Sequence, residues 1–196
     1  MGATTTQQAE TDGEIVRLLE AGDLEAAATG ALRTYGPQVL AYLHLFMRDD
    51  EAAHEVFSQF GEDLWTGISQ FRGECSVKGW LYKLATHAAH RFFREAYHHH
   101  VRRLRTGEAS RIAAEIRSSF ASYQRVAVRD RLSRIRDQLA PEEQALLMLR
   151  VDQGLTWPEI AEILWDPDDP VDALALRKRF SRLRKKLRVL AKAEGL

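Results

Sequence analysis

The chain has 196 residues, 45% of them hydrophobic and 29% charged, which is the composition of an ordinary soluble protein with a packed core. No stretch reaches the roughly 18 apolar residues of a membrane span, and the single cysteine, Cys75, excludes an intramolecular disulfide. The N-terminal residues lack the basic and apolar regions of a signal peptide, so we expect a cytoplasmic protein.

Helical periodicity runs through nearly the whole sequence and predicts an all-α fold. Residues 1–11 are small and polar and predict a disordered tail, after which Asp12 is a cap for a first short helix. The apolar spacing then predicts three longer helices, over residues 23–47, 50–66 and 77–96.

The composition changes after residue 96. Residues 97–110 are rich in His, Arg, Gly and Ser without an apolar stripe, so 97–123 is predicted to be a flexible linker, in part helical. The sequence thus predicts two helical bundles, a first domain over 12–96 and a second over 124–196.

Order is predicted to resume near 123–139, after which Pro141 opens a helix over 141–152 that Gly154 ends. Thr156 and Glu159 form a capping box for a short helix over 156–164. The acidic, proline-containing segment 165–170 interrupts the pattern, and a long amphipathic helix follows over 171–190.

Charge is strongly segregated although the formal net charge is zero. Nine basic and no acidic residues stand between Leu174 and Lys192, whereas seven acidic and no basic residues stand between Asp152 and Asp172. A short helix, a turn and a basic helix form the pattern of a helix-turn-helix, whose second helix enters the major groove. Such a helix is also compatible with a solvated face, a membrane surface or an acidic partner.

Arg and Lys suit DNA because Arg can fork onto guanine and both can neutralise phosphates. The predicted DNA contacts are five basic residues of this helix and one serine: Arg177, Lys178, Arg179, Ser181, Arg182 and Lys185.

Two sets of segments carry a resemblance to extracytoplasmic-function (ECF) sigma factors of RNA polymerase. The second domain resembles their promoter −35-binding domain over residues 139–144, 146–150, 154–156, 159–164 and 179–187. The first domain resembles their core-binding and −10-binding domain over residues 50–65, 71–73 and 76–85.

The resemblance implies a function in transcription initiation. The helix 50–66 is expected to dock on the largest polymerase subunit through five polar residues, Asp50, Glu51, Glu55, Gln59 and Glu62. The loop 69–77 is expected to capture a flipped base of the −10 element between aromatic and polar groups. The predicted −10 contacts are Phe71, Arg72, Glu74, Ser76, Lys83, His87, Arg91 and Arg94, whereas Trp80 is expected to be core.

The chain departs from the resemblance at four positions. Family members commonly carry Asn at position 87, Asp at 91, Gln at 58 and an aromatic residue at 61, where this chain has His87, Arg91, Ser58 and Gly61. We therefore expect an altered −10 preference and an altered polymerase contact.

Two other classes of protein remain open. A metal-binding protein is suggested by His98–His100 with Cys75, His87 and His90, but no carboxylate or second cysteine stands at ligand spacing, so no metal or cofactor is predicted. A stand-alone helix-turn-helix regulator is the second. No phosphate loop or catalytic motif predicts an enzyme. The expected partners are core RNA polymerase, promoter DNA and, as for many family members, an anti-sigma factor.

Overall fold

The computed structural model describes residues 2–96, 109, 111–118, 135–164 and 170–193. Within these ranges the ordered elements are helices and there is no strand, which confirms the predicted all-α class. No helix among the described residues is long and apolar enough to cross a membrane.

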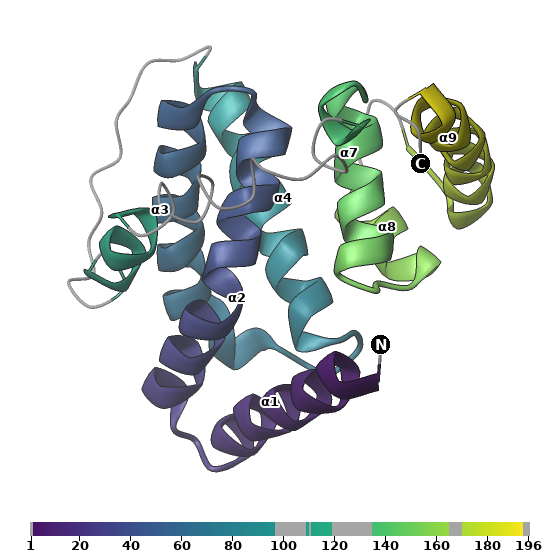
Figure 1. Cartoon of the computed structure of the whole chain (residues 1–196). Helices are drawn as coiled ribbons and strands as arrows, with labels where there is room; N and C mark the ends of the chain where they lie inside the picture. Colours follow the sequence, from purple (N-terminus) through teal and green to yellow (C-terminus); the bar gives the residue numbers. More distant parts are fainter. Residues whose placement is uncertain (1, 97–108, 110, 119–134, 165–169, 194–196) are drawn as a thin grey trace.

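The N-terminal half is a bundle around one central helix. Its elements are α1 (Gly2–Glu20), α2 (Leu24–Met47), α3 (Asp50–Gly67), the 3₁₀ turn η1 (Ile68–Gln70) and α4 (Val77–Ala96). The helix α2 packs against α1, α3 and α4 (Figure 1). Because three helices bury it, α2 is apolar on most of its surface.

The first helix differs from the sequence-based expectation. The structure has α1 start at Gly2, within the segment 1–11 for which the sequence predicts a disordered tail. Asp12, the predicted cap, lies inside this helix and accepts a hydrogen bond from the hydroxyl of Tyr35 on α2. The helix ends where expected, since Gly22 adopts a positive φ of 78° and Asp23 caps α2 by accepting from the Ala26 amide at 3.1 Å.

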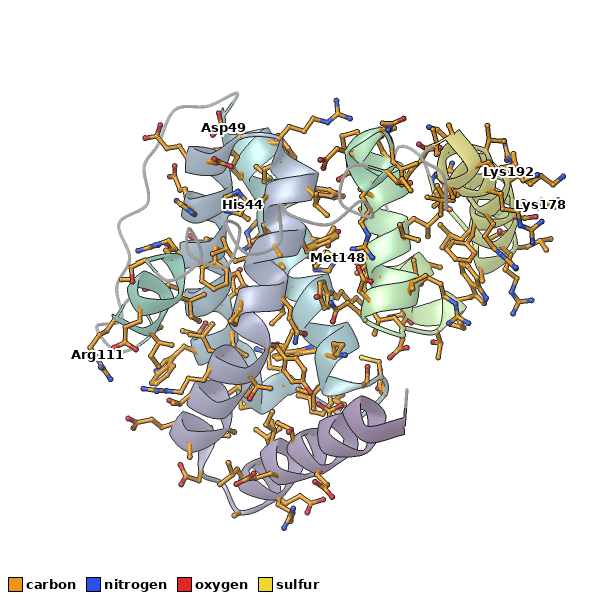
Figure 2. All side chains as sticks on the ribbon, viewed as in Figure 1. His44, Asp49, Arg111, Met148, Lys178 and Lys192 are labelled. Carbon is orange, nitrogen blue, oxygen red and sulfur yellow. The ribbon has the colours of Figure 1, made fainter. Side chains whose placement is uncertain are left out.

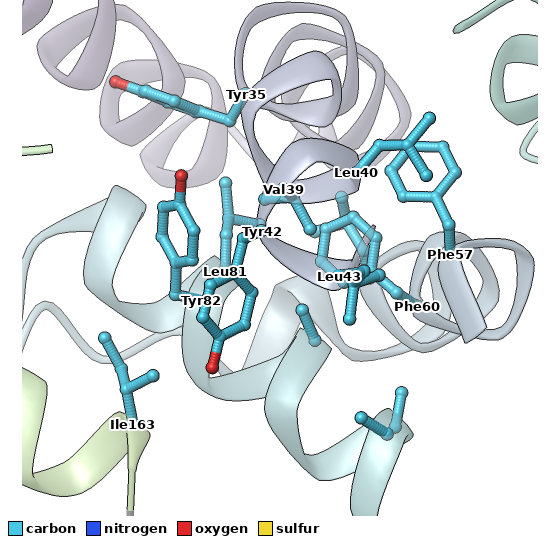
Figure 3. Close-up of a cluster of buried hydrophobic side chains, with 14 of the residues drawn as sticks. Tyr35, Val39, Leu40, Tyr42, Leu43, Phe57, Phe60, Leu81, Tyr82 and Ile163 are labelled. Atoms are coloured by element: carbon cyan, nitrogen blue, oxygen red, sulfur yellow. The ribbon is translucent and has the colours of Figure 1, made fainter. Parts of the chain in front are cut away.

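Aromatic residues fill the centre of this bundle. The rings of Tyr42 and Tyr82 meet edge to face at 5.3 Å, and Phe57 and Phe60 are buried in the same cluster (Figure 3). The Tyr42 hydroxyl pairs with Thr86 Oγ1 at 3.0 Å. Burial raises the pKa of Tyr42, so this hydroxyl stays protonated.

The C-terminal half packs directly on this bundle. Its elements are α7 (Pro141–Leu147), the π-helical turn η2 (Met148–Asp152), α8 (Trp157–Ile163) and α9 (Ala173–Ala193). The helix α7 contacts α2, and α8 contacts α4, so that Leu149 and Ile160 belong to the same buried cluster as Tyr42. The helix α9 contacts α7 and α8 and lies on their far side from α2 (Figure 1).

A short helix over residues 111–118 lies inside the predicted linker. Its Ile112, Ala113 and Ile116 are buried in the N-terminal core. Residues 97–108, which include the histidines at 98–100, residues 110 and 119–123 of the predicted linker, and the turn segment 165–169 lie outside the described residues.

Candidate nucleic-acid and polymerase interface

The basic helix α9 exposes one charged face. Its buried Leu176 and Leu183 anchor the opposite face, and Phe180 meets Trp157 of α8 edge to face at 5.4 Å. Asp172 caps the helix by accepting from the Ala175 amide at 2.6 Å. The six residues predicted to contact the −35 element are exposed along this helix: Arg177, Lys178, Arg179, Ser181, Arg182 and Lys185.

The exposed side chains of α9 do not all point into solvent, because Lys186 pairs with Glu143 of α7 at 2.5 Å and Arg179 and Arg182 line a cavity next to α7. Figure 2 shows Lys178 and Lys192 extending outward from the helix. The helix α8 begins at the predicted capping box of Thr156 and Glu159 and contacts α9, as the two helices of the predicted helix-turn-helix would. The arrangement leaves α9 accessible to a major groove.

The loop before α4 brings aromatic and polar groups together. Phe71 lies edge to face with Trp80, 5.6 Å between ring centroids, and both rings are half-buried. Arg72 and Glu74 are exposed on either side of Gly73, whose φ is +71°. The two rings form an aromatic wall next to exposed polar side chains. A surface of this kind can hold an unstacked base.

Trp80 and Tyr82, near the start of α4, differ in how deeply they are buried. Trp80 packs on the core edge beside Phe71, as expected for a packing residue. Tyr82 is fully buried and lies among the core aromatics, so it is not accessible to DNA.

Further along α4, four predicted −10 residues share one side. Lys83 is partly buried and His87 and Arg94 are exposed, whereas Arg91 forms an ion pair with Asp63 of α3. Partial desolvation, followed by the positive charges of Lys83, His90 and Arg91, lowers the pKa of His87. His87 is therefore neutral at pH 7 and suits a base edge better than a phosphate.

The predicted polymerase contacts lie along α3. Glu51 and Glu55 are exposed, and Gln59 and Glu62 continue the same helical spacing with partial burial. Asp50 is also exposed and receives a 2.7 Å hydrogen bond or ion pair from His44 Nδ1. Gln59 donates to Asp63 at 3.1 Å, which links this row to the ion pair with Arg91.

Ser58 and Gly61, two of the departures, face the helix 111–118. Arg117 of that helix donates to the Ser58 hydroxyl, and a Cβ at position 61 would lie 3.9 Å from Ala113 Cβ. A small residue at each position leaves room for the additional helix.

Sequence analysis missed one set of contacts altogether. Glu159 Oε1 accepts from the Ser76 hydroxyl at 2.5 Å and from its amide at 3.2 Å. Glu162 pairs with Lys83 at 2.9 Å, and Lys78 Nζ donates to the Gln153 carbonyl at 3.2 Å. The acidic run 152–172 was the available signal, but nothing in the sequence shows which residues it meets.

The described residues contain no group of three or more His, Cys, Asp and Glu that could hold a metal ion. Residues 98–100, on which the metal-binding alternative depends most, lie outside them. Cys75 is half-buried, and its pKa is raised by burial and then by Glu162 and Glu159. A thiol in this setting is a poor nucleophile.

Comparison with known proteins agrees with this geometry. Residues 31–99, which include α3, the aromatic loop and α4, match the family described as sigma-70 region 2. The chain is thus similar to sigma-70 region 2 over this segment. The matched segment contains every residue predicted to contact the −10 element or the polymerase.

Two curated relatives extend the similarity beyond region 2. The chain is 25% identical to the RNA polymerase sigma-H factor of Pseudomonas aeruginosa over 183 residues, which are 87% of this chain and 91% of that protein. It is 27% identical to the RNA polymerase sigma factor YlaC of Bacillus subtilis over 135 residues, 67% of this chain and 76% of that protein. No solved structure matches significantly. The region 2 match and the relatives support a sigma factor, which is a non-catalytic protein of transcription initiation.

Proposed function

We propose that this protein is a sigma factor of the ECF type, which binds core RNA polymerase and recognises promoters through a −35 and a −10 element. The observation that carries the proposal is the presence, in one chain, of a region 2 match and of the exposed basic helix α9 on a helix-turn-helix scaffold. A stand-alone regulator needs only the second feature.

The proposed −35 contacts are on α9. Its N-terminal turns carry Arg177, Lys178 and Arg179, which are exposed, and Arg179 also lines a cavity between α9 and the N-terminal bundle. In a helix-turn-helix these positions reach base edges, while later basic residues such as Lys185 neutralise phosphates. Ser181 and Arg182 lie between these two groups.

The proposed −10 contacts are in the loop before α4 and on the exposed side of α4. The Phe71–Trp80 wall would stack against an unpaired base, and Arg72 and Glu74 would contact its edge. His87, neutral at pH 7, is proposed to contact a base, while Arg94 contacts a phosphate. Since family members commonly carry Asn at 87, the preferred −10 sequence would be a different one.

The proposed polymerase contact is the row of α3 that contains Glu51, Glu55, Gln59 and Glu62, with Asp50 at its start. Carboxylates in a regular row complement a basic partner surface. We place the protein in the cytoplasm with the polymerase, and an anti-sigma factor is a proposed regulator.

The direct test is in vitro transcription with sigma-free core polymerase and genome-wide mapping of transcript starts. We expect discrete starts that share a two-part upstream element. Arg177→Ala should weaken selection at the −35 half, and His87→Asn should change the −10 half. Arg188→Ala is the control, because Arg188 is an exposed basic residue of α9 outside the predicted contacts.

The competing candidate is the stand-alone regulator. That protein would bind duplex promoter DNA tightly without polymerase, with a steep salt dependence. Tight duplex binding together with no co-elution with core polymerase would replace the sigma-factor proposal with this one.

A further inference from the structure

A cavity of about 540 Å³ lies between the N-terminal bundle and the C-terminal helices. Phe46 of α2 and Phe93 of α4 line it from the bundle, and Leu146 of α7 and Leu183 of α9 line it from the C-terminal half. Sites for small molecules in proteins commonly have volumes of about 300–1,000 Å³. The cavity is therefore large enough to hold a small organic ligand.

Much of the cavity lining is apolar. Leu176 and Leu183 of α9 are 1% and 2% exposed. On the side of the bundle, the ring of Phe46 stacks on His90 with 5.8 Å between centroids and lies 6.4 Å from Phe93. Phe93 is 50% exposed although its side chain is large and apolar. The apolar part of a ligand would remove this surface from water, which is favourable.

Two carboxylates line the cavity at the start of α7, and each is paired with a cation. Glu142 pairs with Arg48 at 2.6 Å, and Glu143 pairs with Lys186 at 2.5 Å. Burial acts to raise the pKa of Glu143, but the hydrogen bonds from Lys186 and from the Ala140 amide outweigh it and hold the pKa below its usual value. The negative charge of both carboxylates is therefore balanced within the protein.

Two arginines bring further positive charge to the cavity. Arg179 and Arg182 line it from α9, where their spacing of three residues makes them neighbours on the helix surface. A guanidinium group can bind a carboxylate through two parallel hydrogen bonds. Because Glu142 and Glu143 are already balanced, these arginines leave the cavity with an excess of positive charge, which an anion complements.

We propose that this cavity is a binding site for a small amphipathic carboxylate. Arg179 and Arg182 bind the carboxylate group, and the apolar part of the ligand lies between Phe93 and the buried leucines of α9. The inference goes beyond the proposed function and does not depend on it, because binding is measured on the free chain without polymerase or DNA.

Octanoate is the probe, because it joins a carboxylate to a flexible apolar chain. Isothermal titration calorimetry of the full-length protein compares it with octanol, which has the chain without the charge, and with acetate, which has the charge without the chain. We expect octanoate to bind about tenfold more tightly than octanol, since only octanoate makes the charge-assisted contact, and acetate to show no measurable binding.

The variant that removes the positive charge is Arg179→Gln/Arg182→Gln. Glutamine has nearly the helix propensity of arginine, so α9 is retained. We expect octanoate affinity to fall about tenfold and octanol affinity to stay the same. Arg184→Gln/Arg188→Gln is the matched control, because it removes two charges from exposed positions of the same helix that lie outside the cavity lining. It should bind octanoate as the unsubstituted chain does.

The apolar part of the site is tested by two further variants. Ala145→Phe places a ring where Ala145 lines the cavity, and it should abolish binding of octanoate and octanol alike. Phe93→Ser removes an apolar wall at a half-exposed position, so it does not depend on a buried substitution, and it should weaken both ligands by a similar factor. Circular dichroism and urea midpoints check that each variant is folded.

The absence of octanoate binding to the unsubstituted chain would overturn the proposal. Equal affinities for octanoate and octanol would also overturn it, because the arginines would then contribute nothing. An equal loss of affinity in the two double-arginine variants would show that octanoate responds to the total charge of α9 and not to this cavity. Unchanged octanoate affinity in folded Phe93→Ser would place the binding elsewhere on the molecule.

Discussion

Glu159 uses its two carboxylate oxygens on two different helices. Oε2 accepts from the Thr156 amide and hydroxyl, both at 2.8 Å, at the start of α8, whereas Oε1 accepts from Ser76 at the start of α4. Burial acts to raise the pKa of Glu159, but the hydrogen bonds from Ser76 and Thr156 outweigh it and hold the pKa below its usual value.

This shift has a definite consequence for stability against pH. A carboxyl whose pKa is lowered by folding stabilises the fold above its unfolded pKa, and the contribution is lost as pH falls through the folded value. We expect Glu159→Ala to lower the free energy of unfolding by about 2 kcal/mol at pH 7, since hydrogen bonds to a charged group and a helix cap are lost together. Urea unfolding at pH 7 and below pH 4 measures it, and the difference from the unsubstituted chain should shrink at the lower pH.

Glu142→Ala is the comparison for this prediction. Glu142 pairs with Arg48 at 2.6 Å, but their side chains are 74% and 61% exposed. An exposed pair of this kind contributes at most about 1 kcal/mol. An equal loss in both variants would show that the two cap interactions of Glu159 are not the cause.

The sequence predicts one of the two roles of Glu159, which is the capping of α8. The spacing Thr-x-x-Glu before an apolar run indicates a capping box, and the structure has it. Its contact with Ser76 joins residues 83 positions apart, and no local pattern encodes such a partner. For the same reason the charge pattern showed that 152–172 is acidic but not that it faces Lys83.

At the scale of elements, the helix 111–118 explains two departures that the sequence shows without a cause. Ser58 accepts from Arg117, Gly61 faces Ala113, and Ile112 is buried beside them. The linker composition concealed this helix, because only three of its residues are buried and the flanking segment is polar. Helices with long apolar stripes, such as α2 and α3, were predicted within a few residues of their observed bounds.

Gly61 provides a test with two opposite expectations. The Cβ of Gly61→Ala would be in ordinary van der Waals contact with Ala113, so the gain in helix propensity should raise stability by about 0.5–1 kcal/mol. Gly61→Trp has no room and should displace the helix 111–118, with a lower urea midpoint and faster proteolysis after Arg111 or Arg117. A tryptophan variant as stable and as protease-resistant as the unsubstituted chain would show that this helix does not pack on α3.

At the scale of the whole molecule, charge is separated although it sums to zero. The basic residues gather on the outer face of α9, while the carboxylates of α8 and α3 lie on other surfaces. Local fields rather than net charge then govern attraction to DNA. The segregation is visible in the sequence, but its orientation follows only from the packing of α9 beyond α7 and α8 (Figure 1).

Two arginine variants can distinguish the effect of the local electrostatic field on DNA binding from the effect of the net charge. Arg177 is exposed on α9 and Arg33 is exposed on α2, so replacing either by alanine removes the same single charge. The salt dependence of binding to promoter duplex, measured by fluorescence anisotropy between low and moderate salt, counts the phosphates that are neutralised. We expect Arg177→Ala to reduce the slope of log K against log salt by about 1, and Arg33→Ala to leave it unchanged. Equal slopes for the two variants would mean that DNA senses the total charge of the protein, and the outer face of α9 would then not be the DNA-binding surface.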